Sequence, residues 1–335
     1  MISPGVIFLV ICVVVSAGCI SSQNSPARAS PRNTQLPAAG AGIQPGADNG
    51  LNPENLTQWG SQGSGNGQFR NPGGIAADTD GNIYVADSGN DRVQKFMPDG
   101  TYLAQWGVSG IGNGQFRNPE GIATDKNGNV YVVDSGNNRI QKFAPDGTYL
   151  TQWGSEGTGN GEFEDPEGIA VSPDGDVYVA DYDYGNDMIQ AFTSDGTYVT
   201  RWGPEGNGNG EFEGPEGMAV GPDGYVYIAD FRNNRVQAFA SNGMYVLQWG
   251  SPGTGDGQFE GPAGVAADTD GNIYVVDAGN NRLQEFTPDG TYVAWWNSPS
   301  TGTGGSENPR DIAVGSGGSA YVTSYQDSRI QKFST

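Results

Sequence analysis

Short apolar runs separated by turn residues recur along the chain from residue 51 onward. In the first full unit the runs are GIAAD at 74–78, IYVAD at 83–87, RVQKFM at 92–97 and YLAQW at 102–106. Gly, Asn, Asp and Pro fill the gaps between them, which is typical of the tight turns that join antiparallel strands. The runs are rich in β-branched and aromatic residues and nearly apolar throughout, so the pattern predicts strands packed on both faces.

The unit repeats at a nearly constant interval. The equivalent phenylalanines are Phe69, Phe116, Phe163, Phe212 and Phe259, with spacings of 47, 47, 49 and 47 residues, and Pro262 and Pro309 continue the series. Four antiparallel strands per repeat at this spacing predict the blades of a β-propeller, in which each repeat packs on its neighbours.

The two ends of the repeat region complement each other. The last repeat, from residue 308 onward, contains three strand-like runs and lacks a fourth. The missing run stands at the start of the region, where LTQWG at 56–60 matches LTQWG at 150–154. We therefore predict an all-β, six-bladed propeller over 51–335, in which this amino-terminal strand completes the last blade and covers an edge that could aggregate.

The repeated motifs resemble those of the NHL repeat family. The residues that carry the resemblance are Pro-x-Gly-Ile-Ala in the first strand, Asp-Gly-Asn-Ile-Tyr-Val-Ala-Asp across the second and Asn-Asn-Arg-Ile-Gln-Lys-Phe across the third, and they recur over residues 56–335. The resemblance implies a propeller fold. Because the family includes RNA-binding domains, sensor domains, a few lyases and many surface scaffolds, it leaves the function open.

The first fifty residues differ from the repeats in composition. The apolar run at 6–15 is followed by Ser-Ala-Gly and Cys19, which predicts an export signal over 1–19. The Ala-Gly-Cys ending resembles a lipoprotein signal, in which the sulfur of Cys19 carries the lipid; an ordinary signal and an uncleaved anchor are the alternatives. Residues 20–50 are rich in Ser, Pro, Ala and Gly and predict a flexible linker. On this interpretation the protein is exported, and it is secreted or held at the cell surface through its amino terminus alone.

Composition limits the chemistry that is available. The sequence has 38 acidic and 16 basic residues, a formal net charge of -22, no histidine, and cysteine only at Cys12 and Cys19. The negative charge disfavours nucleic acid as a partner. Without histidine the usual base at neutral pH and the commonest nitrogen ligand of zinc are missing, which argues against Ser-His-Asp and zinc enzymes.

Two repeated features are expected to be structural. The pair Asp87 and Arg92 recurs in other repeats, and a charge-assisted hydrogen bond between the two would fix the turn between the second and third strands. A tryptophan also recurs at the end of the fourth strand. We assign this position to Trp59, Trp106, Trp153, Trp202, Trp249 and Trp295, and expect core or blade-edge packing there.

Positions that break the repeat are the candidate site residues. The residue between Pro and Gly in the first strand is Gly73, Glu120, Glu167, Glu216, Ala263 and Arg310 in successive repeats. Because the innermost strand of a blade lines the channel, these side chains should lie near one channel mouth. The three glutamates would then form an acidic arc on adjacent blades, with Arg70, Arg117 and Arg310 on the other side. This pattern predicts a site for a polar or cationic ligand, or for calcium held by carboxylates; solvated loop charge is the alternative.

The third repeat is two residues longer than its neighbours. Its insertion reads DYDYGND at 181–187, and Met188 replaces the arginine of the other repeats. Asp181, Asp183 and Asp187 would repel one another less if they bound a cation, which makes them a candidate metal site. An elongated hairpin with solvated acids is the alternative.

Two classes of function fit these residues. The first is a non-catalytic scaffold that binds a protein, a glycan or a small ligand through the channel mouth and the inter-blade loops. Tyr182, Tyr184 and Phe231, aromatic residues that break the repeat beside the acidic arc, favour it. The second is a calcium-dependent lyase or lactonase-like hydrolase, in which calcium at the mouth polarises the substrate. The absence of histidine counts against the second class, because known propeller lyases depend on histidine ligands or bases.

Overall fold

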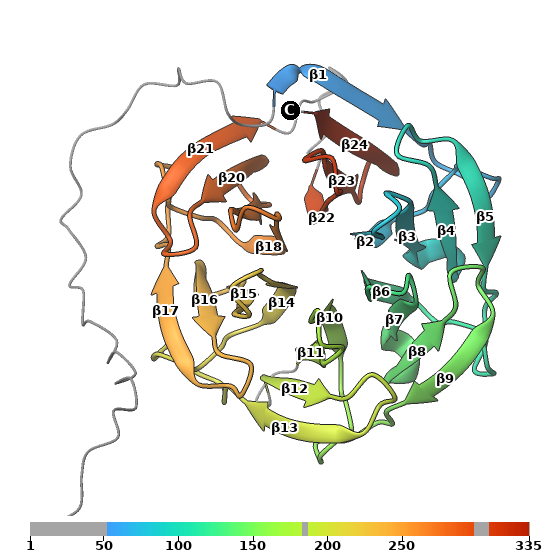
Figure 1. The fold of residues 1–335 in the computed structure, drawn as a ribbon, viewed down its shortest axis with the longest axis horizontal. Helices are drawn as coiled ribbons and strands as arrows, with labels where there is room; N and C mark the ends of the chain where they lie inside the picture. The colour runs from blue at the N-terminus through green and yellow to red at the C-terminus, as the bar shows by residue number, and fades with distance from the viewer. Residues whose placement is uncertain (1–51, 183–186, 298–307, 335) are drawn as a thin grey trace, which may run out of the picture. The chain divides into compact units, whose positions relative to one another are not determined.

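The computed structural model describes residues 52–182, 187–297 and 308–334. These residues form six four-stranded antiparallel sheets arranged as blades around a central channel (Figure 1). The prediction of an all-β, six-bladed propeller is confirmed. The predicted export signal, Cys19 and the 20–50 linker lie outside the described residues. No helix among the residues described here has the length and apolar character needed to cross a bilayer.

In blades one to five the strands follow chain order from the channel outward. Blade one contains β2 (Pro72–Ala77), β3 (Ile83–Asp87), β4 (Arg92–Phe96) and β5 (Tyr102–Trp106), with the 3-10 turn η1 (Ser88–Asn90) after β3. Blade two contains β6 (Pro119–Thr124), β7 (Val130–Asp134), β8 (Arg139–Phe143) and β9 (Tyr149–Trp153), with η2 (Ser135–Asn137) after β7. Blade three contains β10 (Pro166–Val171), β11 (Val177–Asp181), β12 (Met188–Phe192) and β13 (Tyr198–Trp202). Blade four contains β14 (Pro215–Val220), β15 (Val226–Asp230), β16 (Arg235–Phe239) and β17 (Tyr245–Trp249). Blade five contains β18 (Pro262–Ala267), β19 (Ile273–Asp277), β20 (Arg282–Phe286) and β21 (Tyr292–Asn297).

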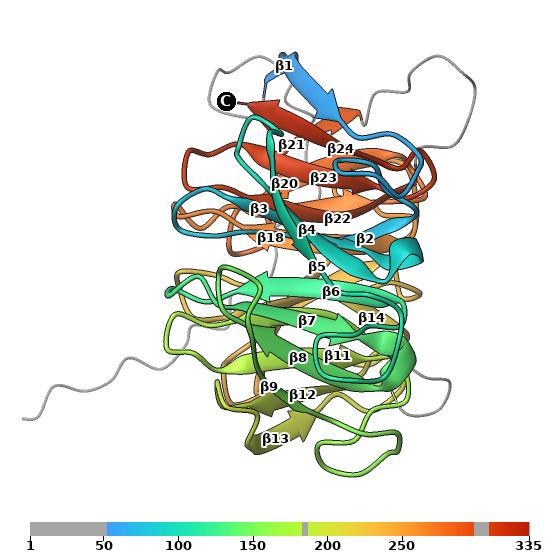
Figure 2. The same cartoon turned by 90° about the vertical axis from the view of Figure 1, so that its right-hand side faces the viewer.

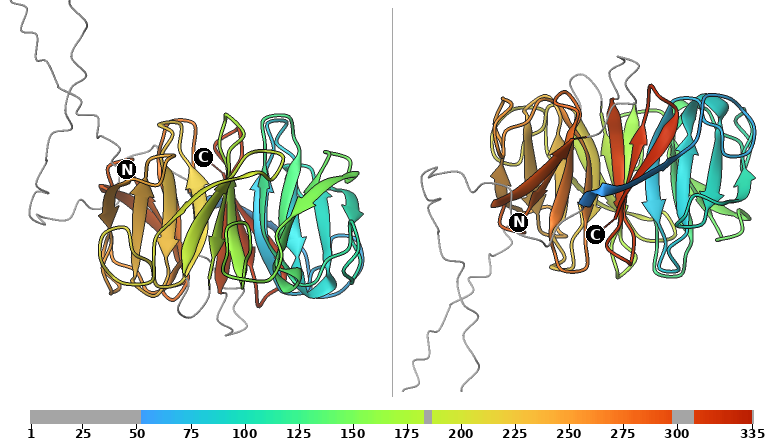
Figure 3. Two further views of the ribbon diagram at one scale, coloured as in Figure 1. Left: turned by 90° about the horizontal axis from the view of Figure 1, so that it is seen from below. Right: turned by 90° about the horizontal axis from the view of Figure 1, so that it is seen from above.

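The sixth blade joins the two ends of the repeat region. It contains β22 (Pro309–Val314), β23 (Ala320–Ser324), β24 (Arg329–Ser334) and, as its outer strand, β1 (Asn52–Trp59). β1 lies antiparallel beside β24, with Thr57 opposite Lys332 and Trp59 opposite Ile330 (Figure 2 and Figure 3). The predicted closure of the ring by the amino-terminal strand is therefore confirmed.

The apolar core lies between neighbouring blades. One cluster joins Tyr84 and Val93 of blade one to Ile122, Val132 and Phe143 of blade two, and all five side chains are buried. The same arrangement recurs at the other blade interfaces. This packing explains why the strands carry apolar residues on both faces.

Glycine allows the innermost strands to approach one another closely. A Cβ atom on Gly74 would lie 2.5 Å from the carbonyl oxygen of Glu120 in the next blade, and the spaces at Gly121 and Gly168 are tighter still. Blade six has Asp311 at this position. Its carboxylate accepts a hydrogen bond of 2.9 Å from the backbone N–H of Ile75 in blade one, so a side-chain contact joins the last blade to the first.

The repeated Asp–Arg pair has the expected structural role. In blade one Nε of Arg92 lies 2.7 Å from a carboxylate oxygen of Asp87, and both side chains are buried. The guanidinium of Arg92 also donates to the carbonyl oxygens of Ser64, Gly65 and Gln68 in the preceding loop. The pair therefore ties the β3–β4 turn to the long glycine-rich loop that leads into the blade.

The assignment of Trp295 to the repeated tryptophan position was wrong. In blade five Trp296 lies opposite Leu283, as Trp249 lies opposite Val236 in blade four. Trp296 is buried, whereas Trp295 is 42% exposed and its ring lies 5.9 Å from the guanidinium carbon of Arg282. Adjacent residues of a strand point to opposite faces, so a shift of one position exchanges a buried ring for an exposed one.

Candidate functional site

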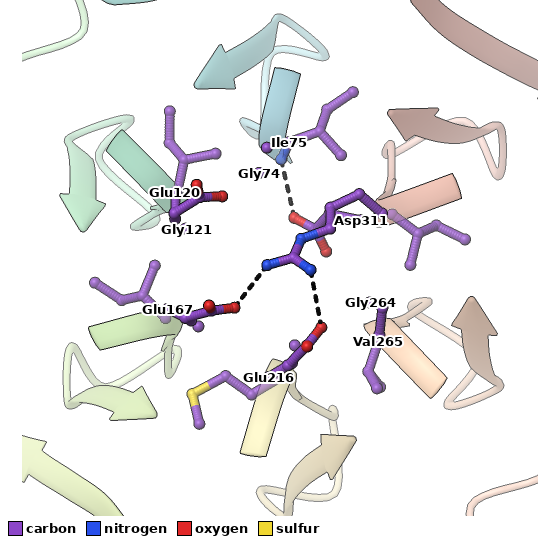
Figure 4. Close-up of a pocket in the computed structure, with 18 residues that line it drawn as sticks. Gly74, Ile75, Glu120, Gly121, Glu167, Glu216, Gly264, Val265 and Asp311 are labelled. Carbon is purple, nitrogen blue, oxygen red and sulfur yellow. Dashed lines mark hydrogen bonds and ion pairs between the residues drawn. The ribbon is translucent and has the colours of Figure 1, made fainter. Parts of the chain in front are cut away.

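A small cavity lies at one mouth of the central channel. Its volume is about 70 Å³, and the amino-terminal ends of the six innermost strands line it. Glu120, Glu167 and Glu216 come from blades two, three and four, and Arg310 and Asp311 come from blade six (Figure 4). The structure thus brings together four of the six charged residues predicted at the mouth, Glu120, Glu167, Glu216 and Arg310. The cavity has room for a few water molecules or for one small group of a ligand.

The side chain of Arg310 reaches across the channel to the acidic side. Its Nη2 lies 2.6 Å from Oε2 of Glu167, and its Nη1 lies 3.4 Å from Oε2 of Glu216. Blade six stands opposite blade three, so the guanidinium spans the channel. Arg310 comes from the blade opposite Glu167, as predicted, but its side chain pairs with the glutamates at the centre. Arg117 lies just before β6 of blade two, the strand that carries Glu120, so the predicted separation into an acidic and a basic arc does not extend to it.

The three glutamates of the cavity have pKa values above the ordinary range. Burial raises the pKa of Glu120 to about 7 and that of Glu216 to about 8; Arg310 opposes these shifts and the neighbouring carboxylates add to them. Burial also raises the pKa of Glu167 above its usual range. The pKa of Asp311 rises to about 6, again through burial. The cluster therefore retains protons near neutral pH, and added positive charge would displace them.

Two contacts position Glu120. The side-chain amide of Asn118 donates to Oε1 of Glu120 at 2.8 Å. Asn118 itself has a left-handed backbone, with a φ of 48°. Its backbone N–H donates to a carboxylate oxygen of Asp91 in blade one at 2.8 Å. The carboxylate is thus held by a turn that is anchored to the preceding blade.

Arg117, another of the residues predicted at the mouth, does not line the cavity. Its side chain is exposed, and its backbone N–H donates to a carboxylate oxygen of Asp134 at 2.7 Å. Arg70 has the same exposed setting in blade one, where its N–H donates to Asp87. The structure places both arginines on the face of the mouth but outside the cavity.

Blade three replaces the buried Asp–Arg pair with a different arrangement. Asp181 is fully buried and accepts hydrogen bonds from the backbone N–H groups of Glu164 and Asp165, at 3.1 and 3.0 Å. Met188 lies opposite it in the strand register. Because no guanidinium among the described residues reaches Asp181, burial raises its pKa to about 7.

Arg201 supplies the guanidinium that Met188 lacks, but from the neighbouring strand β13. Its Nη1 donates to the carbonyl oxygen of Thr158 at 2.8 Å and lies 3.8 Å from Sδ of Met188. The equivalent carbonyl in blade one belongs to Ser64 and is bound by Arg92. The contact to the loop is therefore preserved in blade three, while the contact to the aspartate is not.

Asp187 takes part in a contact between blades. Its carboxylate accepts a hydrogen bond of 2.7 Å from the N–H of Gly214 in blade four, as Asp91 does from Asn118. Asp183, the third member of the candidate metal site, and Tyr184 lie outside the described residues. Within the part of the chain that the structure describes, no group of three or more acidic side chains is arranged to hold a metal ion.

A second hollow opens next to Arg310, between blades four, five and six. Its volume is about 460 Å³, and its walls include Phe231, Arg232, Ala278 and Arg310. Sequence reasoning singled out Phe231 but missed Arg232, which stands where blades one and two have Gly89 and Gly136. It also missed Asp311, which replaces a glycine found in all five other repeats. Both residues break the repeat, so the same comparison of positions would have found them.

Comparison with known proteins identifies the repeat family to which the blades belong. The model of the family described as NHL repeat matches residues 69–96, 116–143, 163–192, 212–239 and 259–286. The chain contains NHL repeats. The matched ranges fall in blades one to five, and each ends at the last residue of its third strand.

Solved structures share the fold of this NHL propeller. A gluconolactonase from Xanthomonas campestris has a TM-score of 0.62 and 15% identity, over 80% of this chain and 87% of that one. A protein of unknown function from Bacteroides thetaiotaomicron has a TM-score of 0.62 and 20% identity, over 84% and 76%. A catalytically inactive histidine-to-alanine variant of virginiamycin B lyase from Staphylococcus aureus, with quinupristin, has a TM-score of 0.57 and 15% identity, over 86% and 98%. At these identities the likeness establishes the fold alone.

Proposed function

We propose that this NHL propeller is a non-catalytic binding protein that holds a cationic group of its ligand at the channel mouth. The group would be a protonated amine or a guanidinium, carried by a protein, a peptide or an amino sugar. The supporting observation is the convergence of Glu120, Glu167 and Glu216 on the single guanidinium of Arg310. The apolar run at 6–15 and Cys19 support presentation of this propeller outside the cell, with the amino terminus as its tether.

The charge balance of the mouth favours a cation. When ionised, the three glutamates leave two negative charges uncompensated by Arg310, and Asp311 adds a third. Burial raises the pKa values of Glu120 and Glu216, and the neighbouring carboxylates add to the shift while Arg310 opposes it. A bound ammonium group would bring positive charge to this cluster and donate hydrogen bonds to the carboxylates. Hydrogen bonds between a charged donor and a carboxylate belong to the stronger class.

The same site gives less support to catalysis. The lyase of Staphylococcus aureus is described as inactive when one histidine is changed to alanine, and this chain has no histidine. One observation nevertheless favours a hydrolase or lyase as a second candidate: Glu216, with a pKa of about 8, would be protonated at neutral pH and able to act as a general acid. Turnover of a sugar lactone that is lost in Glu216→Gln would support this candidate over the first.

Calorimetric titration with a cationic probe tests the proposal. We expect the full-length chain to bind tri-lysine and to bind the same peptide with acetylated amines at least about tenfold more weakly. Affinity should rise from about pH 6 to about pH 8, because Glu120 and Glu216 lose their protons while the lysine amines stay charged. Binding should release protons over this range, which titration in buffers of different ionisation enthalpy measures.

Matched variants locate the binding. Glu120→Gln should weaken tri-lysine binding about tenfold, whereas Glu205→Gln, the same change at an exposed loop residue, should leave it unchanged. Equal binding of the charged and acetylated peptides, or equal effects of the two variants, would reject the mouth as a cation site. Displacement of the peptide by calcium at low concentration would instead support the hypothesis that the mouth binds a metal ion.

A further inference from the structure

We propose that blade five binds a calcium ion between Asp268 and Glu285, at a site separate from the channel mouth. Asp268 lies in the turn between β18 and β19, and Glu285 lies in β20. We call these two carboxylates, together with the hydroxyl of Tyr274 in β19, the blade-five acid cluster. None of the three residues lines the cavity at the mouth, so the inference goes beyond the proposed function.

Other blades place a positive charge at this position. In blade two the ammonium of Lys142 lies 4.7 Å from the centroid of the Tyr131 ring and 4.0 Å from Oδ2 of Asp125. It also donates to the carbonyl oxygen of Ser194 in blade three at 3.0 Å. The fold therefore has a place for a cation between the tyrosine, the aspartate and the next blade. In three blades a lysine of the third strand lies opposite a tyrosine of the second: Lys95 opposite Tyr84, Lys142 opposite Tyr131 and Lys332 opposite Tyr321.

Blade five has a carboxylate where these blades have the ammonium. Glu285 lies opposite Tyr274 in the strand register, and Asp268 occupies the position of Asp125. The hydroxyl of Tyr274 lies 3.2 Å from Oδ2 of Asp268 and 3.4 Å from Oε1 of Glu285. A hydroxyl has one hydrogen to donate, so it satisfies one carboxylate at a time. The exchange of lysine for glutamate therefore places a second acid beside the aspartate, where these three blades have a positive charge.

Glu285 is buried with one oxygen unpaired. The residue is 4% exposed, and among the described residues no group donates a hydrogen bond to its Oε2. Burial raises the pKa of Glu285 to about 7; Asp268 adds to the shift and the hydrogen bond from Tyr274 opposes it. A buried charged oxygen without a partner is costly, so a cation bound at Oε2 would stabilise the ionised side chain.

Calcium fits the donors of the cluster. It binds oxygen ligands, chiefly carboxylates, carbonyl groups and water, and its two charges match the two acids. Asp268 is half-buried, whereas its equivalents Asp78 and Asp125 are buried, so water can reach the ion on that side and complete its shell. Two carboxylates are few for calcium, so we expect a weak site, with a Kd of about 0.1–1 mM.

Calorimetric titration of the full-length chain with calcium chloride at pH 8 tests the site. We expect binding in this range of Kd and its loss in Glu285→Lys, which gives blade five the ammonium of blades one, two and six. The fold should accept the change, because three blades already carry lysine at this position. Absence of calcium binding by the natural protein up to about 10 mM, or equal binding by Glu285→Lys, would overturn the proposal.

A matched variant controls for the change of net charge. Glu205→Lys makes the same substitution at an exposed loop residue and should leave calcium binding intact. An equal loss of binding in Glu205→Lys would mean that calcium is attracted by the negative surface as a whole, and would overturn the proposal. Glu285→Gln, which keeps the shape of the side chain, should weaken binding about tenfold. No change in this variant would count against the site even if Glu285→Lys failed to fold.

Thermal melts provide a second measurement. Calcium at about ten times its Kd should raise the melting temperature of the natural protein by about 3–5 °C and leave that of Glu285→Lys unchanged. Without calcium, Glu285→Lys should melt above the natural protein, because its ammonium lies where the ion would bind. A lower melting temperature of this variant would contradict a place for a cation in blade five and overturn the proposal.

A cross-test separates this site from the channel mouth. Glu120→Gln should weaken the binding of tri-lysine and spare that of calcium, whereas Glu285→Lys should spare tri-lysine and lose calcium. Loss of calcium binding in Glu120→Gln together with intact binding in Glu285→Lys would place the ion at the mouth and overturn the proposal. Failure of the cation-binding mouth and failure of the blade-five acid cluster are therefore distinguishable.

Discussion

Blades three and six both lack the buried Asp–Arg pair of the other four blades, but a different member of the pair is replaced in each. Blades one, two, four and five keep both members of the Asp–Arg pair, with nitrogen–oxygen distances of 2.6 to 2.7 Å. Blade three keeps Asp181 and has Met188, whereas blade six keeps Arg329 and has Ser324. These two blades stand opposite each other and supply Glu167 and Arg310, whose ion pair crosses the channel.

The comparison shows which part of the repeated contact the fold requires. In blade three the guanidinium of Arg201 still donates to the carbonyl oxygen of Thr158. Among the described residues, the groups that donate to Asp181 are the backbone N–H groups of Glu164 and Asp165. In blade six the guanidinium of Arg329 pairs with Asp327, at 2.9 Å. Blade three thus keeps the hydrogen bond from an arginine to its loop, and blade six keeps an ion pair of its arginine. In neither blade do the described contacts include the Asp–Arg pair of the other four blades.

The largest effect is expected when blade two receives the residue of blade three. Arg139→Met leaves Asp134 buried without its cation and removes the donor to the loop carbonyl groups of Ile111, Gly112 and Gln115. Removing one partner of a buried ion pair costs about 3–5 kcal/mol. We expect a loss of this size in the free energy of unfolding, measured by urea denaturation.

A double variant sharpens this test. Gln152 of blade two occupies the position that Arg201 occupies in blade three. Arg139→Met with Gln152→Arg therefore reproduces the blade-three arrangement and should recover part of the lost stability. If the single variant unfolded at the same urea concentration as the natural protein, the pair would be dispensable in regular blades too.

The next largest effect concerns the pH dependence of stability. The pKa of Asp181 rises from an ordinary value of 3.8 to about 7 in the folded protein. Between these values the folded state holds a proton that the unfolded state has lost, so this contribution is fully present below the lower value and is lost as the pH rises through about 7. Asp181→Asn removes this pH-dependent contribution. Between about pH 5 and about pH 8 the free energy of unfolding of the variant should fall by about 2–3 kcal/mol less than that of the natural protein, because each pH unit accounts for about 1.4 kcal/mol.

Blade two provides the control for this pH effect. Asp134→Asn weakens a complete ion pair, so it should destabilise the protein at both pH values, whereas Asp181→Asn should be nearly neutral at the lower pH and stabilising at the higher. Thermal melts across this range measure both. Parallel curves for the natural protein and Asp181→Asn would mean that Asp181 is ionised throughout and has a cation partner after all.

The sequence was sufficient to predict the parts of the fold that repeat. Turn residues and apolar runs are local signals, and their recurrence located the blades; the innermost strand of blade one, predicted at 74–78, is Pro72–Ala77. The closing strand could be predicted because one repeat lacked a run that the start of the region supplied. Position in the repeat also placed Glu120, Glu167, Glu216 and Arg310 at the mouth.

Interactions that depend on side-chain reach were not predictable in this way. The ion pair between Arg310 and Glu167 joins residues 143 positions apart, and nothing in the periodic pattern indicates how far a guanidinium extends into the channel. In blade three Arg201 donates to the loop carbonyl from a different strand than the arginines of the other blades. Comparison of equivalent positions therefore reveals that Met188 replaces an arginine, but not that Arg201 takes over one of its contacts. The second hollow, next to Arg310, likewise arises from residues of blades four, five and six that become neighbours only in the folded ring.

The smallest effect is expected at the seam that joins blade six to blade one. The hydroxyl of Thr323 donates to the carbonyl oxygen of Gly73 at 2.8 Å and accepts from the N–H of Asp311 at 3.0 Å. Blades two and five have Val133 and Val276 at this position, so Thr323→Val should pack without strain while it leaves two buried polar groups unpaired. We expect a loss of about 1–2 kcal/mol in urea denaturation.

Serine at the same position separates the hydroxyl from the shape of the side chain. Thr323→Ser keeps both hydrogen bonds and removes one methyl group, so it should destabilise the protein less than Thr323→Val. The opposite order would show that packing dominates at this seam. No effect of either variant would mean that the apolar contacts between blades six and one, together with the hydrogen bond from Ile75 to Asp311, hold the seam without this hydroxyl.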